Sequence, residues 1–132
     1  MMRDDQYRAF MIRGEKTVKE YGFTSLPVDV FRLACDLGIS VVEAMPPSPD
    51  VPLPLGASVN ENNEFIIIYN TSFDNVGLER FTIAHELGHY FLHGDSEEVK
   101  HHESRAGFVS NDKREREADC FAAGLLMPRI LL

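Results

Sequence analysis

The sequence predicts an α+β fold, in a single domain that spans residues 1–132. Helical periodicity occurs at both ends of the chain, and β-branched and aromatic residues gather between the helical segments. A chain of 132 residues can bury one core, and 44% hydrophobic with 26% charged residues is ordinary for a globular protein. We therefore expect a short, mostly antiparallel sheet packed against helices.

The chain is acidic, with a formal net charge of −8 and an isoelectric point of about 5.0. Non-specific binding to nucleic acids or anionic membranes needs clustered Lys and Arg, so this charge argues against both, although not against a basic protein partner. The two cysteines, Cys35 and Cys120, have no C-x-x-C partner, and the N-terminus lacks the apolar core of a signal peptide. We expect a cytoplasmic protein with free thiols and no direct contact with nucleic acid or membrane.

Two helices and a strand are predicted in the first 44 residues. Residues 4–21 show helical spacing of their apolar side chains. A second helix starts at Pro27, carries Asp29 in its first turn, where the helix dipole favours a carboxylate, and stops at Gly38. Residues 39–44 are rich in β-branched side chains and form the first strand.

A proline-rich loop and a β-hairpin are predicted next. Residues 45–54 hold five of the seven prolines, which exclude a helix or a central strand and favour an extended surface loop. Residues 56–60 and 64–70 have the composition of two strands, and the Asn-rich segment 60–63 forms the turn between them.

Two further helices complete the prediction. One contains residues 80–94 and can be capped by the Asp-Asn pair at 74–75. Residues 95–109 are polar and are expected to be irregular. The last helix opens at residue 111 or 112 and ends before Pro128. Its expected core-facing residues are Ala118, Phe121, Ala122 and Leu125.

The helix at 80–94 contains the motif His85-Glu86-Leu87-Gly88-His89. Two His four residues apart lie on one face of a helix, where their imidazoles can hold a single metal ion. Glu86 can act as a general base on water that the metal activates. The neighbouring residues are apolar, and buried polar groups are costly unless something satisfies them. We therefore interpret the motif as a metal site, with a structural pair of core histidines as the alternative.

A tetrahedral catalytic zinc needs a third protein ligand from outside the motif. Glu115 is the best candidate, because it begins a helix whose apolar face runs through Ala118 and Ala122. Asp119 lies one turn further near the same face, where it can orient a ligand His through the free ring N–H. The alternative for Glu115 is a helix cap formed with Asp112.

Four other residues are weaker candidates for the third ligand. His93 continues the four-residue spacing, but it lies about 12 Å along the helix from His85, too far for one ion to be shared easily. His101 and His102 lie in the segment expected to be irregular. Glu117 is expected on the flank of the last helix nearer to solvent.

Two stretches of the sequence resemble the ImmA/IrrE family of zinc metallopeptidases. They are R-F-T-I-A-H-E-L-G-H at residues 80–89 and E-R-E-A-D-C-F-A-A-G-L-L-M-P at residues 115–128. The resemblance covers most of the chain and implies a small zincin-like domain. It implies that His85, His89 and Glu115 bind Zn²⁺ and that Glu86 is the catalytic base. Mn²⁺ or Fe²⁺ are alternative ions for such a ligand set.

The resemblance also implies a biological role. Family members are typically cytoplasmic bacterial or phage proteins, and many act on, or beside, a helix-turn-helix repressor. The expected function is therefore zinc-dependent hydrolysis of a peptide bond in a specific protein, a helix-turn-helix transcriptional repressor in a stress- or phage-related regulatory pair. The alternative is a metal-binding protein-interaction or toxin–antitoxin module with little or no proteolysis.

The oxyanion formed during peptide hydrolysis needs a donor in addition to the metal. Candidates are Tyr90, His93, His101 and His102, and each of them has a structural role as its alternative. Tyr69 is a candidate substrate contact, because its strand can pair with an extended peptide by strand addition or can equally be a plain core strand.

Overall fold

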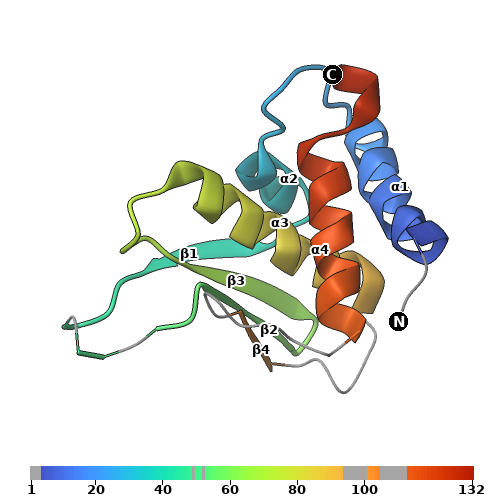
Figure 1. Ribbon diagram of the computed structural model, residues 1–132. Helices are drawn as coiled ribbons and strands as arrows, with labels where there is room; N and C mark the ends of the chain where they lie inside the picture. Colours follow the sequence, from blue (N-terminus) through green and yellow to red (C-terminus); the bar gives the residue numbers. More distant parts are fainter. Residues whose placement is uncertain (1–3, 49, 52, 94–100, 105–112) are drawn as a thin grey trace.

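The computed structural model describes residues 4–48, 50, 51, 53–93, 101–104 and 113–132. The predicted α+β class is confirmed (Figure 1). The elements, in chain order, are α1 (Asp4–Glu20), α2 (Val30–Asp36), β1 (Ser40–Ala44), β2 (Gly56–Glu61), β3 (Glu64–Asn70), α3 (Val76–His93), β4 (His101–Ser104), α4 (Lys113–Leu126) and a C-terminal 3-10 helix, η2 (Arg129–Leu131). In the described part of the chain, no helix combines the length and the apolar character needed to cross a membrane.

The sheet has the strand order β1-β3-β2-β4 and is mostly antiparallel, as predicted. Only β1 and β3 run parallel, with Val42 opposite Ile68. The hairpin of β2 and β3 turns at Asn62 and Asn63, whose φ angles of 54° and 64° are those that a two-residue hairpin turn requires. Asn tolerates such angles better than most residues, which explains the Asn-rich turn.

Strand β4 corrects the sequence prediction, which expected no regular structure between residues 95 and 109. Residues His101–Ser104 pair antiparallel with β2, so that His101 lies opposite Val59 and Ser104 opposite Gly56. Four polar residues carry no strand periodicity, and the strand forms because β2 offers a sheet edge with which their backbone can pair.

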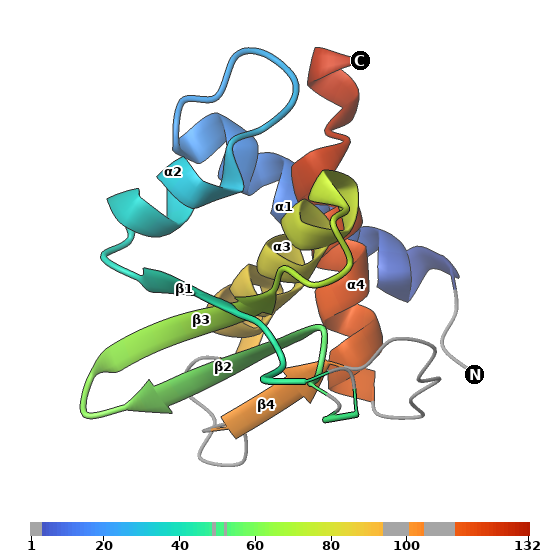
Figure 2. The ribbon, with the colours of Figure 1, turned by 90° about the vertical axis from the view of Figure 1, so that its left-hand side faces the viewer.

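The helices cover one face of the sheet in two layers (Figures 1 and 2). Phe65, Ile67 and Tyr69 alternate along β3 and are buried in the core that also contains Ile83 and Leu87 of α3. Helix α4 packs on α3, and α1 packs on α4. Helix α3 therefore lies between the sheet and α4, which explains why its middle is buried on every side.

Helices α1 and α4 cross at two glycines, because any side chain there would strike the opposing backbone. A Cβ at Gly14 would overlap the carbonyl oxygen of Phe121, and one at Gly124 would overlap that of Met11. The predicted core face of α4, which comprises Ala118, Phe121, Ala122 and Leu125, is fully buried.

Local hydrogen bonds fix the start of two helices. Asn75 accepts from the backbone N–H of Leu78 at 3.0 Å and caps α3, as predicted. Asp29 accepts from the backbone N–H of Arg32 at 3.1 Å. It is therefore the N-cap of α2, not a residue of its first turn, and Pro27 precedes the helix. The predicted start of the last helix, at 111 or 112, lies outside the described residues, and so does the proposed cap residue Asp112.

Candidate metal centre

Helix α3 places three ionisable side chains in the interior. Residues Thr82 to His89 are all buried, since the sheet covers one side of the helix and α4 the other. His85 and His89 share one face of α3, and their ring centroids are 4.9 Å apart. Glu86 is 0% exposed. Such groups are stable in a protein interior only when each has a polar or ionic partner.

Helix α4 brings Glu115 to the two imidazoles. Its Oε2 lies 3.2 Å from Nε2 of His85, and its Oε1 lies 2.9 Å from Nε2 of His89. The two Nε2 atoms are themselves 3.2 Å apart. His85, His89 and Glu115 thus form a compact donor group, with one ligand atom from each residue and all of these atoms within 4.8 Å of one another.

The spacing of these donors fits a divalent ion. Ligand atoms about 2.0–2.1 Å from a tetrahedral zinc are separated from one another by about 3.3 Å. The two Nε2 atoms are 3.2 Å apart, and each lies 2.9 to 3.2 Å from a different oxygen of Glu115, so these separations are close to this value. Two imidazoles and a carboxylate are also a donor set that zinc prefers. His85, His89 and Glu115 are therefore a candidate metal site.

Gly88 allows α4 to approach α3 closely enough to form this group. A Cβ at position 88 would lie 3.0 Å from both the Cα and the carbonyl oxygen of Ala118. Ala118 follows Glu115 by one turn of α4, so the small residues at the crossing set the distance between Glu115 and the two imidazoles. The element that approaches Gly88 is therefore α4.

Asp119 holds the far side of the His85 ring. Its Oδ1 lies 2.7 Å from Nδ1 of His85, while its own side chain is 55% exposed. Burial by itself would lower the pKa of His85, but hydrogen bonds to Asp119 and Glu115 outweigh burial and raise that pKa to about 10. The metal-free site therefore favours a proton on His85, and a metal ion would have to displace it.

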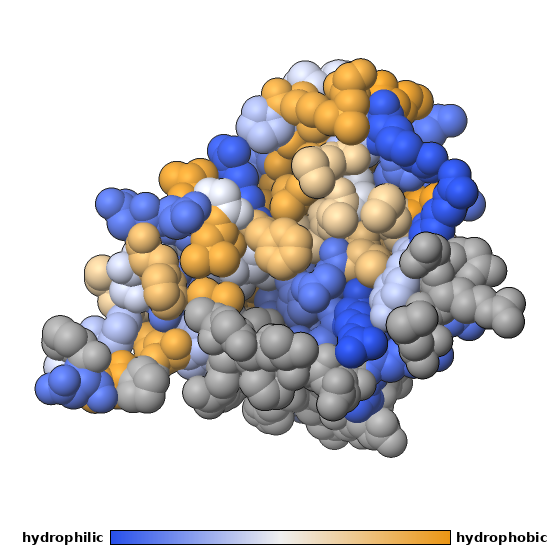
Figure 3. All heavy atoms as spheres, viewed as in Figure 1, coloured by the Kyte–Doolittle hydropathy of each residue, from blue (hydrophilic) through white to orange (hydrophobic). Residues whose placement is uncertain are grey.

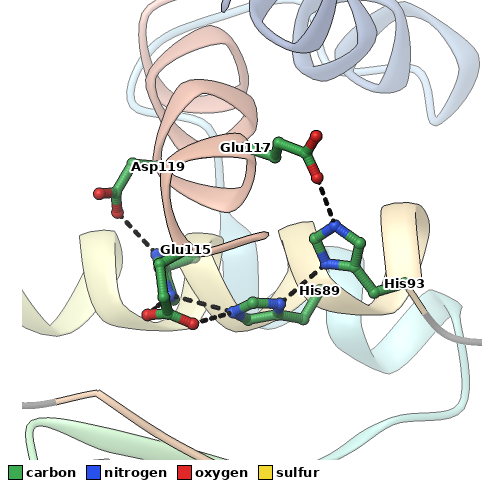
Figure 4. A network of polar contacts seen from close by, with 6 residues as sticks. His89, His93, Glu115, Glu117 and Asp119 are labelled. Atoms are coloured by element: carbon green, nitrogen blue, oxygen red, sulfur yellow. Dashed lines mark hydrogen bonds and ion pairs between the residues drawn. The ribbon is translucent and has the colours of Figure 1, made fainter. Parts of the chain in front are cut away.

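His93 and Glu117 form a contact that the sequence did not predict. Nδ1 of His93 lies 3.0 Å from Nδ1 of His89, and its Nε2 lies 2.9 Å from Oε1 of Glu117 (Figure 4). The expectation that Glu117 lies nearer to solvent than Glu115 is wrong, because their side chains are 13% and 19% exposed. The side chain of Glu117 is shielded from solvent because α4 crosses over α3, and residues on both flanks of α4 face α3 at the crossing.

The other predicted site residues lie in different surroundings. The ring of Tyr90 packs edge-on against Phe65, with centroids 5.1 Å apart. The hydroxyl of Tyr69 donates to Glu43 at 3.1 Å, and burial together with this contact raises the pKa of Tyr69 to about 12. These contacts favour packing roles for both tyrosines. The backbones of His101 and His102 lie in β4, and their side chains are outside the described part of the structure.

Glu86 lies where α3 meets the first residue of β2. A Cβ at Gly56 would lie 3.7 Å from Oε2 of Glu86 and would overlap Thr82. The negative charge of Glu86 also contributes to the raised pKa of His85. Figure 3 shows hydrophilic residues gathered near the centre of this face of the molecule, with hydrophobic residues beside them.

Comparison with known families adds an independent observation. The family model of the M78 peptidases, described as the IrrE N-terminal-like domain, matches residues 35–132. The chain belongs to the ImmA/IrrE family. The ImmA/IrrE match contains α3, α4 and hence the whole candidate metal centre, whereas α1 precedes it. No match is found among curated proteins.

Membership of the ImmA/IrrE family gives the chain a metallopeptidase-like function. The family match and the compact His85, His89 and Glu115 group agree on a metal site within the matched segment. The resemblance noted in the sequence is therefore confirmed at the level of the family.

Proposed function

We propose that the protein is a zinc-dependent endopeptidase that cleaves a specific protein substrate in the cytoplasm. The observation that carries this proposal is the placement of Glu86. Glu86 is fully buried on α3, where it directly follows His85, one member of the His-His-Glu donor group. A purely structural metal site needs four protein ligands and no neighbouring base, whereas a catalytic site combines three ligands with a base.

The residues divide the chemistry between them. His85, His89 and Glu115 would hold a divalent ion, which when bound supplies Lewis-acid chemistry that polarises a peptide carbonyl and makes water more acidic. Glu86 accepts the proton of the attacking water and returns it to the leaving amine. Asp119 keeps the His85 ring in one orientation.

The proposed substrate is a helix-turn-helix transcriptional repressor. The resemblance to ImmA/IrrE proteins supports this choice, and so does charge. A chain of net charge −8 suits a partner that carries the basic surface of a DNA-binding protein, since opposite charges speed association and favour the correct partner. The same charge supports the absence of direct nucleic-acid binding.

The test uses the zinc-loaded protein and any helix-turn-helix repressor that is found encoded beside its gene. We expect one defined cleavage of the repressor, at a rate that falls by about 10²–10⁴-fold in Glu86→Gln because proton transfer is lost. Zinc binding should persist in this variant, because Glu86 is not among the three donors. Measured zinc content and cleavage by mass spectrometry report the two properties separately.

The outcomes distinguish the proposal from its alternative. Cleavage that is equal in the wild type and in Glu86→Gln would contradict the assigned role of Glu86. A stable complex with the repressor that never yields cleaved product would favour the interaction or toxin–antitoxin module. Glu15→Gln is a matched control, because Glu15 is a shielded carboxylate that lies on α1 and pairs with Arg129.

A further inference from the structure

We propose that His93 and Glu117 are positioning residues that hold His89 in the tautomer able to bind a metal ion. The inference rests on the proposed function only through its metal centre and does not require proteolysis. Two distances carry it: Nδ1 of His93 to Nδ1 of His89 at 3.0 Å, and Nε2 of His93 to Oε1 of Glu117 at 2.9 Å.

The direction of both hydrogen bonds follows from Glu117. An ionised carboxylate can only accept, so Nε2 of His93 must carry a proton and donate it to Glu117. A neutral His93 then has a lone pair on Nδ1. Only one proton can lie between two facing Nδ1 atoms, and it must therefore belong to His89.

Nε2 of His89 is the nitrogen that faces His85 and Glu115, and metal binding requires its lone pair. In the metal-free structure Nε2 lies 2.9 Å from Oε1 of Glu115, so a proton shared with that carboxylate has to leave when an ion binds. With the second proton held on Nδ1 by His93, His89 is then a neutral ligand. In the opposite arrangement His89 would accept at Nδ1 and carry its only proton on Nε2, and loss of that proton to a metal ion would leave an imidazolate. Glu117 thus selects the binding tautomer of His89 through His93.

Burial makes the selection effective. The side chains of His89 and His93 are 2% and 9% exposed, so water competes little for either bond. The two ring centroids are 5.1 Å apart, which fixes the orientation of one ring against the other. The network also complements the other ligand: His85 reaches Asp119 directly, whereas His89 reaches Glu117 through an intervening ring, and the two carboxylates lie on opposite sides of α4 (Figure 4).

The first test compares His93→Leu with His93→Asn. The two replacements have nearly the same shape, but only Asn retains an acceptor at the position of Nδ1. We expect the Zn²⁺ affinity, measured by competition with a chromophoric chelator, to fall by about 10- to 100-fold in His93→Leu and to be largely restored in His93→Asn. Equal affinities in both variants, whether unchanged or reduced, would overturn the proposal.

The second test reads the tautomer directly and does not depend on His93→Leu folding. In long-range ¹H–¹⁵N spectra of the zinc-loaded wild type, His93 should show a single tautomer protonated at Nε2. Glu117→Gln should populate both tautomers, since an amide can accept or donate, and should bind Zn²⁺ less tightly. A wild-type His93 protonated at Nδ1, or an unchanged tautomer and affinity in Glu117→Gln, contradicts the inference.

Glu15→Gln serves as the control for both tests, and the tests give a result whether or not a repressor is cleaved. Glu15→Gln replaces a similarly buried carboxylate, 11% exposed, that pairs with Arg129, and should leave the affinity and the His93 spectrum unchanged. If no repressor is cleaved but the His93 and Glu117 variants behave as expected, the proposed endopeptidase activity is wrong, whereas the positioning of His89 by His93 and Glu117 stands.

Discussion

At the scale of single residues, the two imidazoles of the metal centre differ in how their outer nitrogens are held. Asp119 contacts His85 from an exposed position, so water can compete for its carboxylate. His89 meets the buried ring of His93 instead. Hydrogen bonds that orient ligand histidines commonly change metal affinity by about 10- to 100-fold, and the exposed bond should lie at the weaker end of that range.

Replacement of Asp119 by Ala should therefore lower Zn²⁺ affinity by about tenfold, because His85 loses the partner of its Nδ1–H. Asp119→Asn keeps an acceptor oxygen and should lose less. Chelator competition measures both. Asp36→Ala removes a comparably exposed aspartate that pairs with Arg32 on α2, and it should bind zinc as the wild type does. An Asp119→Ala affinity equal to that of Asp36→Ala would exclude a role in positioning.

The grouping of His85, His89 and Glu115 was more predictable than the contact of His93 with Glu117, for a physical reason. His85 and His89 share a face of one helix whatever the rest of the chain does, and Glu115 lies on the core side of its own helix. The contact of His93 with Glu117 depends on how α4 crosses α3, which no local pattern encodes. The four-residue spacing of His85, His89 and His93 was the one signal, and it indicated proximity without revealing the partner.

At the scale of secondary structure elements, the crossing of α1 and α4 depends on backbone contact. Gly14 and Gly124 allow each helix to lie against the carbonyl groups of the other. Helix α4 in turn supplies Glu115, Glu117 and Asp119 to the imidazoles of α3. A contact outside the metal centre thus supports the helix that completes it.

Gly124→Ala should destabilise the protein although Ala is the better helix former. The gain in helix propensity is about 1 kcal/mol. The new Cβ would overlap the backbone of Met11, and overpacking of this kind costs about 1–3 kcal/mol, with a backbone obstacle at the upper end. Urea unfolding should therefore show a lower midpoint.

Gly77→Ala is the matched control for this substitution. Gly77 is exposed in the first turn of α3, and its Cβ would meet only Asn75, at 3.4 Å. This variant should be neutral or slightly stabilised. If Gly124→Ala were as stable as Gly77→Ala, the close crossing of α1 and α4 would not be a constraint on stability.

Elements with their own periodicity or turn chemistry were predicted well, and elements that need a partner were not. The hairpin of β2 and β3 carries β-branched residues and two Asn at its turn, so its register is local. Strand β4 is four polar residues, and only the edge of β2 makes it a strand. Asp29 was expected in the first turn of α2 because the sequence predicts Pro27 as the first helical residue, yet its side chain serves as the cap.

At the scale of the whole molecule, the C-terminal segment is joined to the first helix, near the end of α1. Glu15 of α1 accepts from the guanidinium of Arg129 in η2 at 2.8 Å, and it also accepts from the Arg129 backbone N–H at 2.8 Å. The Arg129 side-chain hydrogen bond is the main cause of the lowered pKa of Glu15. This pair fastens the C-terminal segment to the first helix.

Stability should therefore depend on this pair in a defined pH window. Because the folded pKa of Glu15 lies below its ordinary value of 4.5, its contribution is present above that pH and is lost as the pH falls through the folded pKa. Arg129→Ala should lower the Tm at pH 7, and the difference from wild type should shrink towards about pH 3. Some of the effect persists, because the backbone donor remains.

The measurement is thermal unfolding of both proteins followed by circular dichroism across this range. A Tm difference that stays constant from neutral to acidic pH would show that Arg129 acts through packing alone. Replacement of Arg13, which makes a long 3.8 Å contact with exposed Glu20, provides a control. The difference between its Tm and that of the wild type should hardly depend on pH.

The distribution of acids and imidazoles over α3 and α4 has a consequence for the alignment of these helices. The three carboxylates that contact the imidazoles of the centre come from α4, and the three rings come from successive turns of α3. A displacement of α4 by one residue, about 1.5 Å along its axis, would lengthen several of these short contacts together. Metal binding by this group would therefore depend on the register of α4 against α3, and a chain that misaligns the two helices would bind a metal ion less tightly.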